Sequence, residues 1–199
     1  MFALGLALCP GLALAQAHVG AAIVDGKPVA LYDDGTWEFV FKPKPGCQTL
    51  TKRISLCGEK GQWKRMRSDD PETLASFLSR GDFYVNMYLD ESGLRDDVTM
   101  AFLREAVLEN AAAGTGAMIE DIPVLGIEET EVDGRPGETL VYGVEFNGTP
   151  FVMANTIVLT ADISLQAVVF NIGREYTDMH RAEVAAVLAG LRLGEDDAD

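Results

Sequence analysis

The sequence has few of the residues from which catalytic and metal centres are usually built. It contains two histidines and three cysteines in 199 residues, and no H-E-x-x-H zinc pattern. The nucleophile elbow G-x-S-x-G of esterases is missing, as are the phosphate loops G-x-x-x-x-G-K-[ST] and G-x-G-x-x-G. We therefore expect no cofactor and a protein that acts by binding, with a hydrolase that lacks a recognisable motif as the alternative.

Long apolar runs are also missing beyond the N-terminal segment. Residues 151–172 are rich in Val, Ile and Phe, but polar residues such as Asn155 and Asp162 interrupt them, which is typical of two strands. The net charge of −15 predicts a surface that repels nucleic acid and anionic membranes. We expect neither a nucleic-acid partner nor a transmembrane span.

Residues 1–17 have the composition of a secretory signal peptide. The uncharged apolar part is shorter than the ~20 residues of a membrane span, and it ends in the small-x-small site A-Q-A at Ala17. Cleavage there would make His18 the first mature residue, so we predict a periplasmic or secreted protein. A buried N-terminal helix and a lipid anchor on Cys9 stay open as alternatives.

Turn signals and a linker divide the rest of the chain. Residues 18–41 place Asp-Gly pairs between short apolar runs, which predicts a small β-meander or hairpin element. The K-P-K-P-G segment at 42–46 breaks regular structure and predicts a linker. We expect residues 47–194 to form one α+β domain and residues 195–199 to be a disordered acidic tail.

The α+β domain is predicted to be an antiparallel β-sheet meander packed by helices. Asp70 followed by Pro71 is typical of a helix N-terminus, and Leu74, Phe77 and Leu78 would form its apolar face. The predicted helices cover 70–81, 94–113 and 177–189. The predicted strands cover 54–56 and 62–66, which we expect to pair, then 83–89, 122–132, 139–146, 150–160 and 165–172.

This order of strand, long helix, antiparallel meander and closing helix resembles the PsbP-like fold of the photosystem oxygen-evolving subunit and the Ran-binding Mog proteins. The resemblance covers about 110 residues. It includes the strand and helix at 83–113, the turn V-D-G-R-P-G at 132–137, and L-R-L at 191–193. It implies a binding or assembly module, and it identifies no functional residue.

A second resemblance concerns the N-terminal element. Residues 25–38, DGKPVALYDDGTWE, resemble a short β element found near the N-termini of uncharacterised proteobacterial exported proteins. This resemblance covers about two dozen residues and implies no activity.

Cys47 and Cys57 remain as an even pair after the expected cleavage. An even pair in an exported protein predicts a disulfide, here one that closes a short loop around residues 50–56. A redox role is the alternative, but the spacing is not C-x-x-C.

Basic residues are concentrated in one stretch. Residues 42–67 contain eight Lys and Arg against Glu59 alone, an excess of seven positive charges that leaves −22 for the remainder. This segment either pairs with the acidic body of the chain or binds another, acidic envelope protein. The candidate partner-binding residues are Lys52, Arg53, Lys60, Trp63, Lys64, Arg65 and Arg67. Trp37 is a further candidate contact, and core packing is the alternative for Trp63.

Two other kinds of site are considered. His18, as a mature N-terminus, could bind copper together with His180, unless His180 lies on an exposed turn of the last helix. A curved sheet under a long helix could also enclose a pocket for a small molecule or lipid. Its lining would include Phe83, Met87, Phe102, Met153 and Phe170, which a filled core would equally contain.

Overall fold

The computed structural model describes residues 18–24, 27–39 and 46–194, so the predicted signal peptide and acidic tail lie outside it. The chain divides into two compact units, residues 1–42 and 43–199. In the first unit, three antiparallel strands form a small sheet, β1 His18–Val24, β2 Lys27–Tyr32 and β3 Trp37–Phe39. The Asp-Gly turn between β2 and β3 is held by Asp34, whose Oδ1 accepts a hydrogen bond from the Thr36 amide at 2.9 Å.

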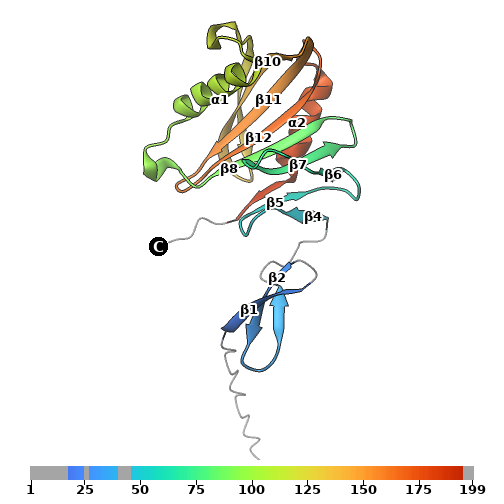
Figure 1. The fold of residues 1–199 in the computed structure, drawn as a ribbon, viewed down its shortest axis with the longest axis vertical. Coiled ribbons are helices and arrows are strands. Elements are labelled where there is room, and N and C mark those ends of the chain that lie inside the picture. Colours follow the sequence, from blue (N-terminus) through green and yellow to red (C-terminus); the bar gives the residue numbers. More distant parts are fainter. Residues whose placement is uncertain (1–17, 25–26, 40–45, 195–199) are drawn as a thin grey trace, which may run out of the picture. The chain divides into compact units, whose positions relative to one another are not determined.

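The second unit is built on a seven-stranded antiparallel sheet (Figure 1). Its strands follow the spatial order β6-β7-β8-β12-β11-β10-β9. Their bounds are β6 Trp63–Met66, β7 Thr73–Ser79, β8 Tyr84–Asp90, β9 Val124–Val132, β10 Arg135–Phe146, β11 Thr149–Leu159 and β12 Ser164–Ile172. The two outer strands differ in charge, because β6 includes exposed Lys64 and Arg65 whereas β9 includes exposed Glu128, Glu129 and Glu131.

Strands β9 to β12 confirm the predicted antiparallel meander. Asn147 and Gly148 have φ of 51° and 80°, as a two-residue hairpin turn with positive φ at both positions requires. Asp133 and Gly134 adopt the same conformation. Strand β10 therefore begins at Arg135, earlier than the expected residue 139.

A second small sheet has the order β13-β5-β4, with β4 Cys47–Thr49, β5 Ile54–Cys57 and β13 Leu191–Leu193. The predicted pairing of 54–56 with 62–66 is wrong, because β5 pairs with β4 and β13 whereas β6 pairs with β7. Strand β13 comes from the end of the chain and occupies the second edge of β5. Local sequence pattern gave no indication of this distant partner.

Residues 73–79 form strand β7, not part of the predicted helix at 70–81. Asp70 does bond the following backbone, but its Oδ1 accepts from the Glu72 amide and its Oδ2 from the Thr73 hydroxyl, both at 2.9 Å, in a turn that leads into a strand. An Asp side chain can accept hydrogen bonds from the following residues either as the N-cap of a helix or in an Asx turn. Residues 73–79 form a strand here because they pair with β6 on one side and with β8 on the other.

Two helices pack on opposite faces of the large sheet, as Figure 1 shows. Helix α1 is Met100–Thr115 and begins later than predicted, because η1 (Leu94–Asp96) is a separate 3-10 turn and Asp97 has φ of 60°. Thr99 caps α1 by accepting a hydrogen bond from the Phe102 amide at 3.1 Å. Helix α2 (Asp178–Gly190) begins after Thr177 as predicted, and η2 (Ile119–Asp121) connects α1 to β9.

The core is divided between these two faces. On the α2 face, the buried side chains include Phe77, Val85, Met87, Val169 and Val187, together with Ile54 and Leu191 of the small sheet. On the α1 face, Leu103 and Val107 pack against side chains of β10 and β11 such as Leu140 and Ile157. Because α1 packs on β10 and β11, it leaves the same face of β8 and β12 open.

Candidate ligand-binding groove

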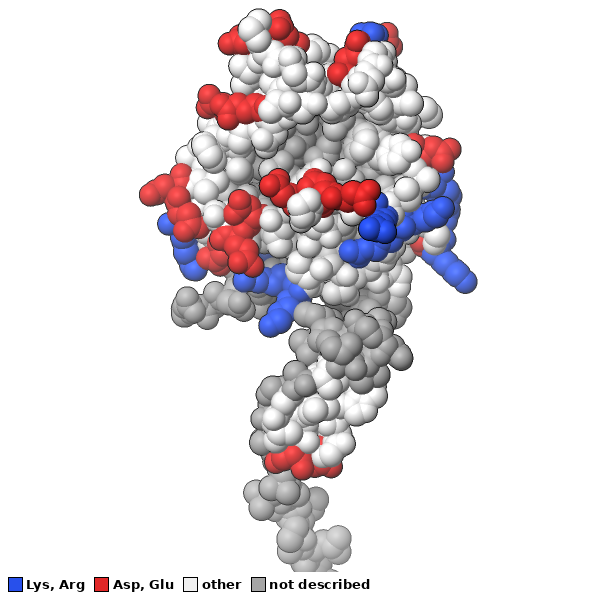
Figure 2. All heavy atoms as spheres, in the orientation of Figure 1, with Lys and Arg blue, Asp and Glu red and all other residues white. Residues whose placement is uncertain are grey.

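A groove with a volume of about 990 Å³ lies on the α1 face, between the helix and the open part of the sheet. Strands β8, β10, β11 and β12 form its floor, and Val107, Asn110 and Ala111 of α1 form one wall. Residues 70–72, in the turn before β7, lie at its rim. Figure 2 shows this face of the molecule hollowed beside α1. The volume is at the upper end of the range for small-molecule sites.

Strand register brings the floor residues together, since alternate residues of a strand point to the same face. One row across the sheet contains Asn86, Val168 and Asn155, and a neighbouring row contains Tyr88 and Gln166. The next row on the other side consists of Tyr84, Phe170, Met153 and Tyr142. The floor therefore has a polar centre and an aromatic end.

Three amide side chains occupy the polar centre. Asn86 Oδ1 accepts a hydrogen bond from the Ser76 hydroxyl at 2.8 Å, and Asn155 Nδ2 donates to Gln166 Oε1 at 2.9 Å. Asn155 is only 2% exposed, yet its Oδ1 has no hydrogen-bond partner among the described residues. A buried carbonyl oxygen without a partner costs roughly 1–3 kcal/mol, so this atom marks a place where a ligand group would be stabilised.

Tyr142 lies beside these amides in the groove. Burial raises the pKa of its phenol well above the ordinary value, and the neighbouring Tyr88 adds to the rise. The Tyr142 hydroxyl therefore stays protonated and can act as a hydrogen-bond donor, but not as a general base near neutral pH.

Aromatic rings form the other end of the groove. Phe170 stacks on Tyr84 with ring centroids 5.3 Å apart, and Phe151 meets Phe170 edge-on at 6.4 Å. Phe146 extends this row, 6.0 Å from Phe151. Such rings present apolar faces against which the carbon skeleton of a ligand can pack.

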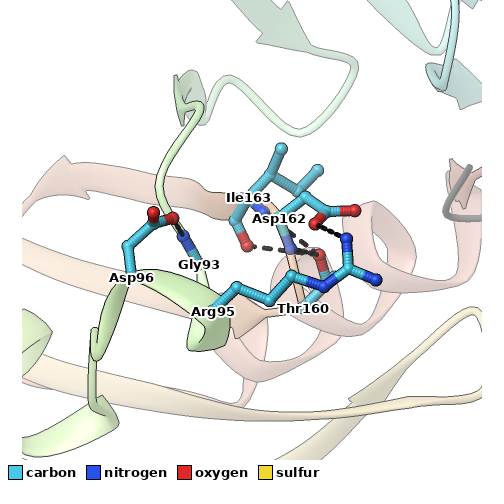
Figure 3. Close-up of polar contacts among 6 residues, drawn as sticks. All are labelled: Gly93, Arg95, Asp96, Thr160, Asp162 and Ile163. Carbon is cyan, nitrogen blue, oxygen red and sulfur yellow. Dashed lines mark hydrogen bonds and ion pairs between the residues drawn. The ribbon is translucent and has the colours of Figure 1, made fainter. Parts of the chain in front are cut away.

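The wall formed by α1 is positioned by contacts between the loop before the helix and the β11–β12 turn (Figure 3). The amides of Leu94 and Arg95 donate to the carbonyls of Thr160 and Ala161 at 2.9 and 3.0 Å. A Cβ atom on Gly93 would lie 2.5 Å from the Ala161 carbonyl oxygen, so only glycine permits this close approach. Figure 3 also shows Arg95 paired with Asp162 at 2.6 Å, a partly exposed ion pair that contributes little by itself.

The charges around the groove have one sign. Its lining includes the carboxylates of Asp70, Glu72 and Asp90, all exposed, and no lysine or arginine among the described residues. A smaller depression of about 580 Å³ lies by the end of α1, but its Arg174 is already paired with Glu145 at 3.0 Å. The large groove is therefore the better candidate binding site.

Residues predicted for a pocket are divided between the two faces of the sheet. Met153 and Phe170 line the groove. Phe83 and Met87 are instead buried in the core on the α2 face. Met87 is at a position of β8 that points away from α1, and Phe83 immediately precedes the strand. Phe102 is 60% exposed and lies outside the groove.

The predicted partner-binding residues do not form one continuous face. Lys64 and Arg65 are neighbours on β6 and point to opposite sides of the sheet, with Arg65 over the Phe77 ring at 5.7 Å.

Lys52, Lys60 and Lys64 are exposed and have no ion pair with any described residue, while Arg67 pairs with nearby Asp69 at 3.4 Å. The expected pairing of the basic segment with the acidic body is therefore not seen for these three lysines. Figure 2 shows basic side chains gathered near β6, beside the acidic ones.

The two tryptophans have different environments. Trp63 is 5% exposed and donates a hydrogen bond from Nε1 to the Cys57 carbonyl at 3.0 Å, so it belongs to the core and is not available as a contact residue. Trp37 is 49% exposed. Arg53 is half-buried near the start of β5.

His180 is buried, contrary to the expected exposed turn. Its Nδ1 accepts a hydrogen bond from the Thr177 amide at 3.2 Å and lies 2.8 Å from the Thr177 hydroxyl, which completes the cap of α2. Its ring packs edge-on against Phe83 at 4.9 Å, and burial lowers its pKa. Nδ1 of His180 is therefore occupied by the helix cap, whereas Nε2 is buried and has no hydrogen-bond partner among the described residues. The side chain of His18 lies outside the described residues, so the copper site stays a prediction. No cluster of three or more possible metal ligands occurs in the described ranges.

Cys47 and Cys57 form the predicted disulfide. They lie directly opposite each other on β4 and β5, so the bond closes a hairpin that contributes Ile54 and Leu56 to the core. Within the described part of the chain, no helix has both the length and the apolar composition of a membrane span.

Sequence reasoning missed the polar floor of the groove. Asn86, Asn155 and Gln166 lie on three strands, and only the cross-strand register brings them together. The signal that the sequence offers is a polar residue inside each of these otherwise apolar strands.

No protein-family model and no curated protein matches the sequence significantly. Among solved structures, cyanobacterial PsbP (CyanoP) from Synechocystis is similar with a TM-score of 0.52 and 12% identity over 94% of this chain and 98% of that chain. A protein from Bacteroides thetaiotaomicron has a TM-score of 0.50 and 11% identity over 78% of this chain and 51% of its own. LpqN of Mycobacterium tuberculosis, involved in cell envelope biogenesis, has a TM-score of 0.45 and 13% identity over 71% of this chain and 83% of that chain.

At these identities the similarity concerns the fold alone. The match to PsbP covers nearly the full length of both chains, and the strand, long helix, meander and closing helix occur in the predicted order. The chain has a PsbP-like fold.

Proposed function

We propose that this chain is an exported, non-catalytic binding module that holds a small molecule in the groove beside α1. The observation that carries the proposal is the buried Asn155 Oδ1 in the floor of the groove, which has no hydrogen-bond partner among the described residues. Export is supported by the Cys47–Cys57 disulfide, since disulfides persist in oxidising compartments, and by the uncharged apolar segment at 1–17.

The chemistry of the groove supports binding over catalysis. Tyr142 stays protonated, and the carboxylates of Asp70, Glu72 and Asp90 are exposed at the rim. The floor therefore presents neutral hydrogen-bonding groups rather than a nucleophile paired with a base.

The test is a bulky substitution on α1 that fills the groove. Ala111→Trp places a large ring in the groove, whereas Ala113→Trp places the same ring at an exposed position of α1 outside it. Thermal unfolding would be followed with a library of neutral, cationic and anionic small molecules. We expect at least one library member to raise the Tm of the wild type and of Ala113→Trp, but not of Ala111→Trp. Equal shifts in all three proteins, or no shift in any, would contradict the proposal.

A second candidate function is the docking of an acidic envelope protein. It is supported by Lys52, Lys60 and Lys64, which are exposed and have no ion pair with a described residue. Arg53, Arg65 and Arg67 lie in the same segment and extend the candidate surface.

This second candidate predicts binding that depends on salt. The full chain would be used to capture proteins from its own envelope extract, with elution at rising salt. We expect one acidic protein to be released at moderate salt, and to be lost with Lys60→Glu/Lys64→Glu. Retention of that protein by the double variant would exclude the basic segment as the docking surface.

A further inference from the structure

We infer that the groove binds an uncharged, polyhydroxylated ligand, a saccharide, through the amides of Asn86, Asn155 and Gln166. This inference rests on the proposed function, because it assigns a ligand class to the same groove.

The charged residues that line the groove argue against an anionic ligand. The groove is lined by three carboxylates and, among the described residues, by no lysine or arginine. An anionic ligand such as a phosphate, a nucleotide or a fatty acid would lose its hydration in the groove and would meet no described cation there to compensate.

The hydrogen-bonding groups on the floor match hydroxyl groups. A hydroxyl both donates and accepts, and amide side chains offer both functions. Asn155 Oδ1 is a buried acceptor without a partner among the described residues, so it would accept a hydrogen bond from a ligand hydroxyl. Gln166 uses its Oε1 to accept from Asn155, and no described residue accepts from its Nε2 donors. Asn86 bonds Tyr88 only at 3.4 Å, so its Nδ2 can also donate to a ligand.

The aromatic end suits the carbon face of a sugar ring. Tyr84 and Phe170 stack with an interplanar angle of 19°, and they lie in the row next to Asn86 and Asn155. A pyranose has polar edges and apolar C–H faces. It would place its hydroxyls on the amides while its ring packs against the aromatic side chains.

A cationic ligand fits these positions less well. The carboxylates that would attract it are exposed at the rim, where solvent screens them, and Asp70 already accepts two hydrogen bonds from its own turn. A cation at the floor would also face the Nε2 donors of Gln166.

The experiment is isothermal titration calorimetry of the full chain with named probes. The neutral probes are maltotriose, cellotriose and triacetylchitotriose, the cationic probe is spermidine, and the anionic probe is inorganic phosphate. We expect at least one trisaccharide to bind and phosphate not to bind. Asn86→Ala and Gln166→Ala are each expected to weaken trisaccharide binding about tenfold, the effect of one lost hydrogen bond.

Asn171→Ala is the matched control. Asn171 lies on β12 like Gln166, but at an odd-numbered position that points to the opposite face, so its loss should leave binding unchanged. Binding of spermidine that is weakened by Asn86→Ala, without trisaccharide binding, would overturn the ligand class and leave the proposed function standing. Absence of heat with every probe, together with no Tm shift in the small-molecule library, would overturn both. Trisaccharide binding that is insensitive to Asn86→Ala and Gln166→Ala would overturn the assignment to these amides.

Discussion

The two faces of the seven-stranded sheet are covered to different extents. On the α2 face, a helix and a three-stranded sheet close over a continuous apolar core. On the α1 face, one helix packs over β10 and β11 and leaves amides, phenols and aromatic rings of β8 and β12 in an open groove. This difference indicates a division of work, in which the α2 face supplies stability and the α1 face supplies recognition.

The largest expected effect tests this division with one residue from each face. Phe77 is fully buried on the α2 face, so Phe77→Ala should destabilise the protein by about 3–5 kcal/mol. Phe170 is half-buried in the groove, so Phe170→Ala should cost only about 1–2 kcal/mol. Urea unfolding with an unchanged m-value would measure both. Equal losses would show that the groove is part of the stabilising core.

The disulfide sharpens the same comparison, because it closes a hairpin on the α2 side. For a loop with a sequence separation of 10, Cys47→Ser/Cys57→Ser should lower the free energy of unfolding by roughly 2–3 kcal/mol. Ligand binding in the groove should stay unchanged when measured well below the Tm of the variant. A comparable loss of affinity in the folded variant would show that the two faces are coupled.

His180 adds a dependence on pH to the α2 side. Burial lowers its pKa in the folded protein below the ordinary 6.5, so the unfolded chain binds the proton more readily. Stability should therefore fall as the pH drops below 6.5 and be insensitive to this residue above it. His180→Gln keeps a side chain that can complete the Thr177 cap but does not titrate, so it should flatten this part of the profile. Parallel profiles for the two proteins between pH 7 and pH 5 would contradict this assignment.

The smallest effect is expected at the outer strand β6. Lys64 is exposed and has no ion pair with a described residue, so Lys64→Glu should change stability by no more than about 0.5 kcal/mol. Thermal unfolding at low and high salt would measure it. A larger change that disappears in salt would show that the basic segment interacts with the acidic body after all.

The sequence correctly predicts the turns and helix ends that depend only on neighbouring residues. Asn147-Gly148 specified a hairpin, and Thr177 specified the start of α2. Local signals failed where a distant partner decides, as in β7, where Asp70 and Pro71 resemble a helix start, and in β5, whose second partner is β13.

The candidate site was harder to predict for the same reason. The pocket was expected between sheet and helix, and Met153 and Phe170 do line it. Phe83 and Met87 were misplaced because an apolar residue on a strand does not reveal which face it occupies when both faces are buried. The amides that define the groove come from strands β8, β11 and β12, so their convergence depends on register.

Strand β9 also affects how the protein behaves at high concentration. An outer strand can act as a template for pairing with another molecule, and β9 has exposed Val124, Leu125 and Ile127 near one end. Glu128, Glu129 and Glu131 place like charges next to this apolar end, so two copies repel each other when their β9 edges approach. Near the sequence pI of about 4.4 the net charge of the chain approaches zero, so the repulsion between two copies weakens. Acid-induced aggregation should therefore begin at this edge.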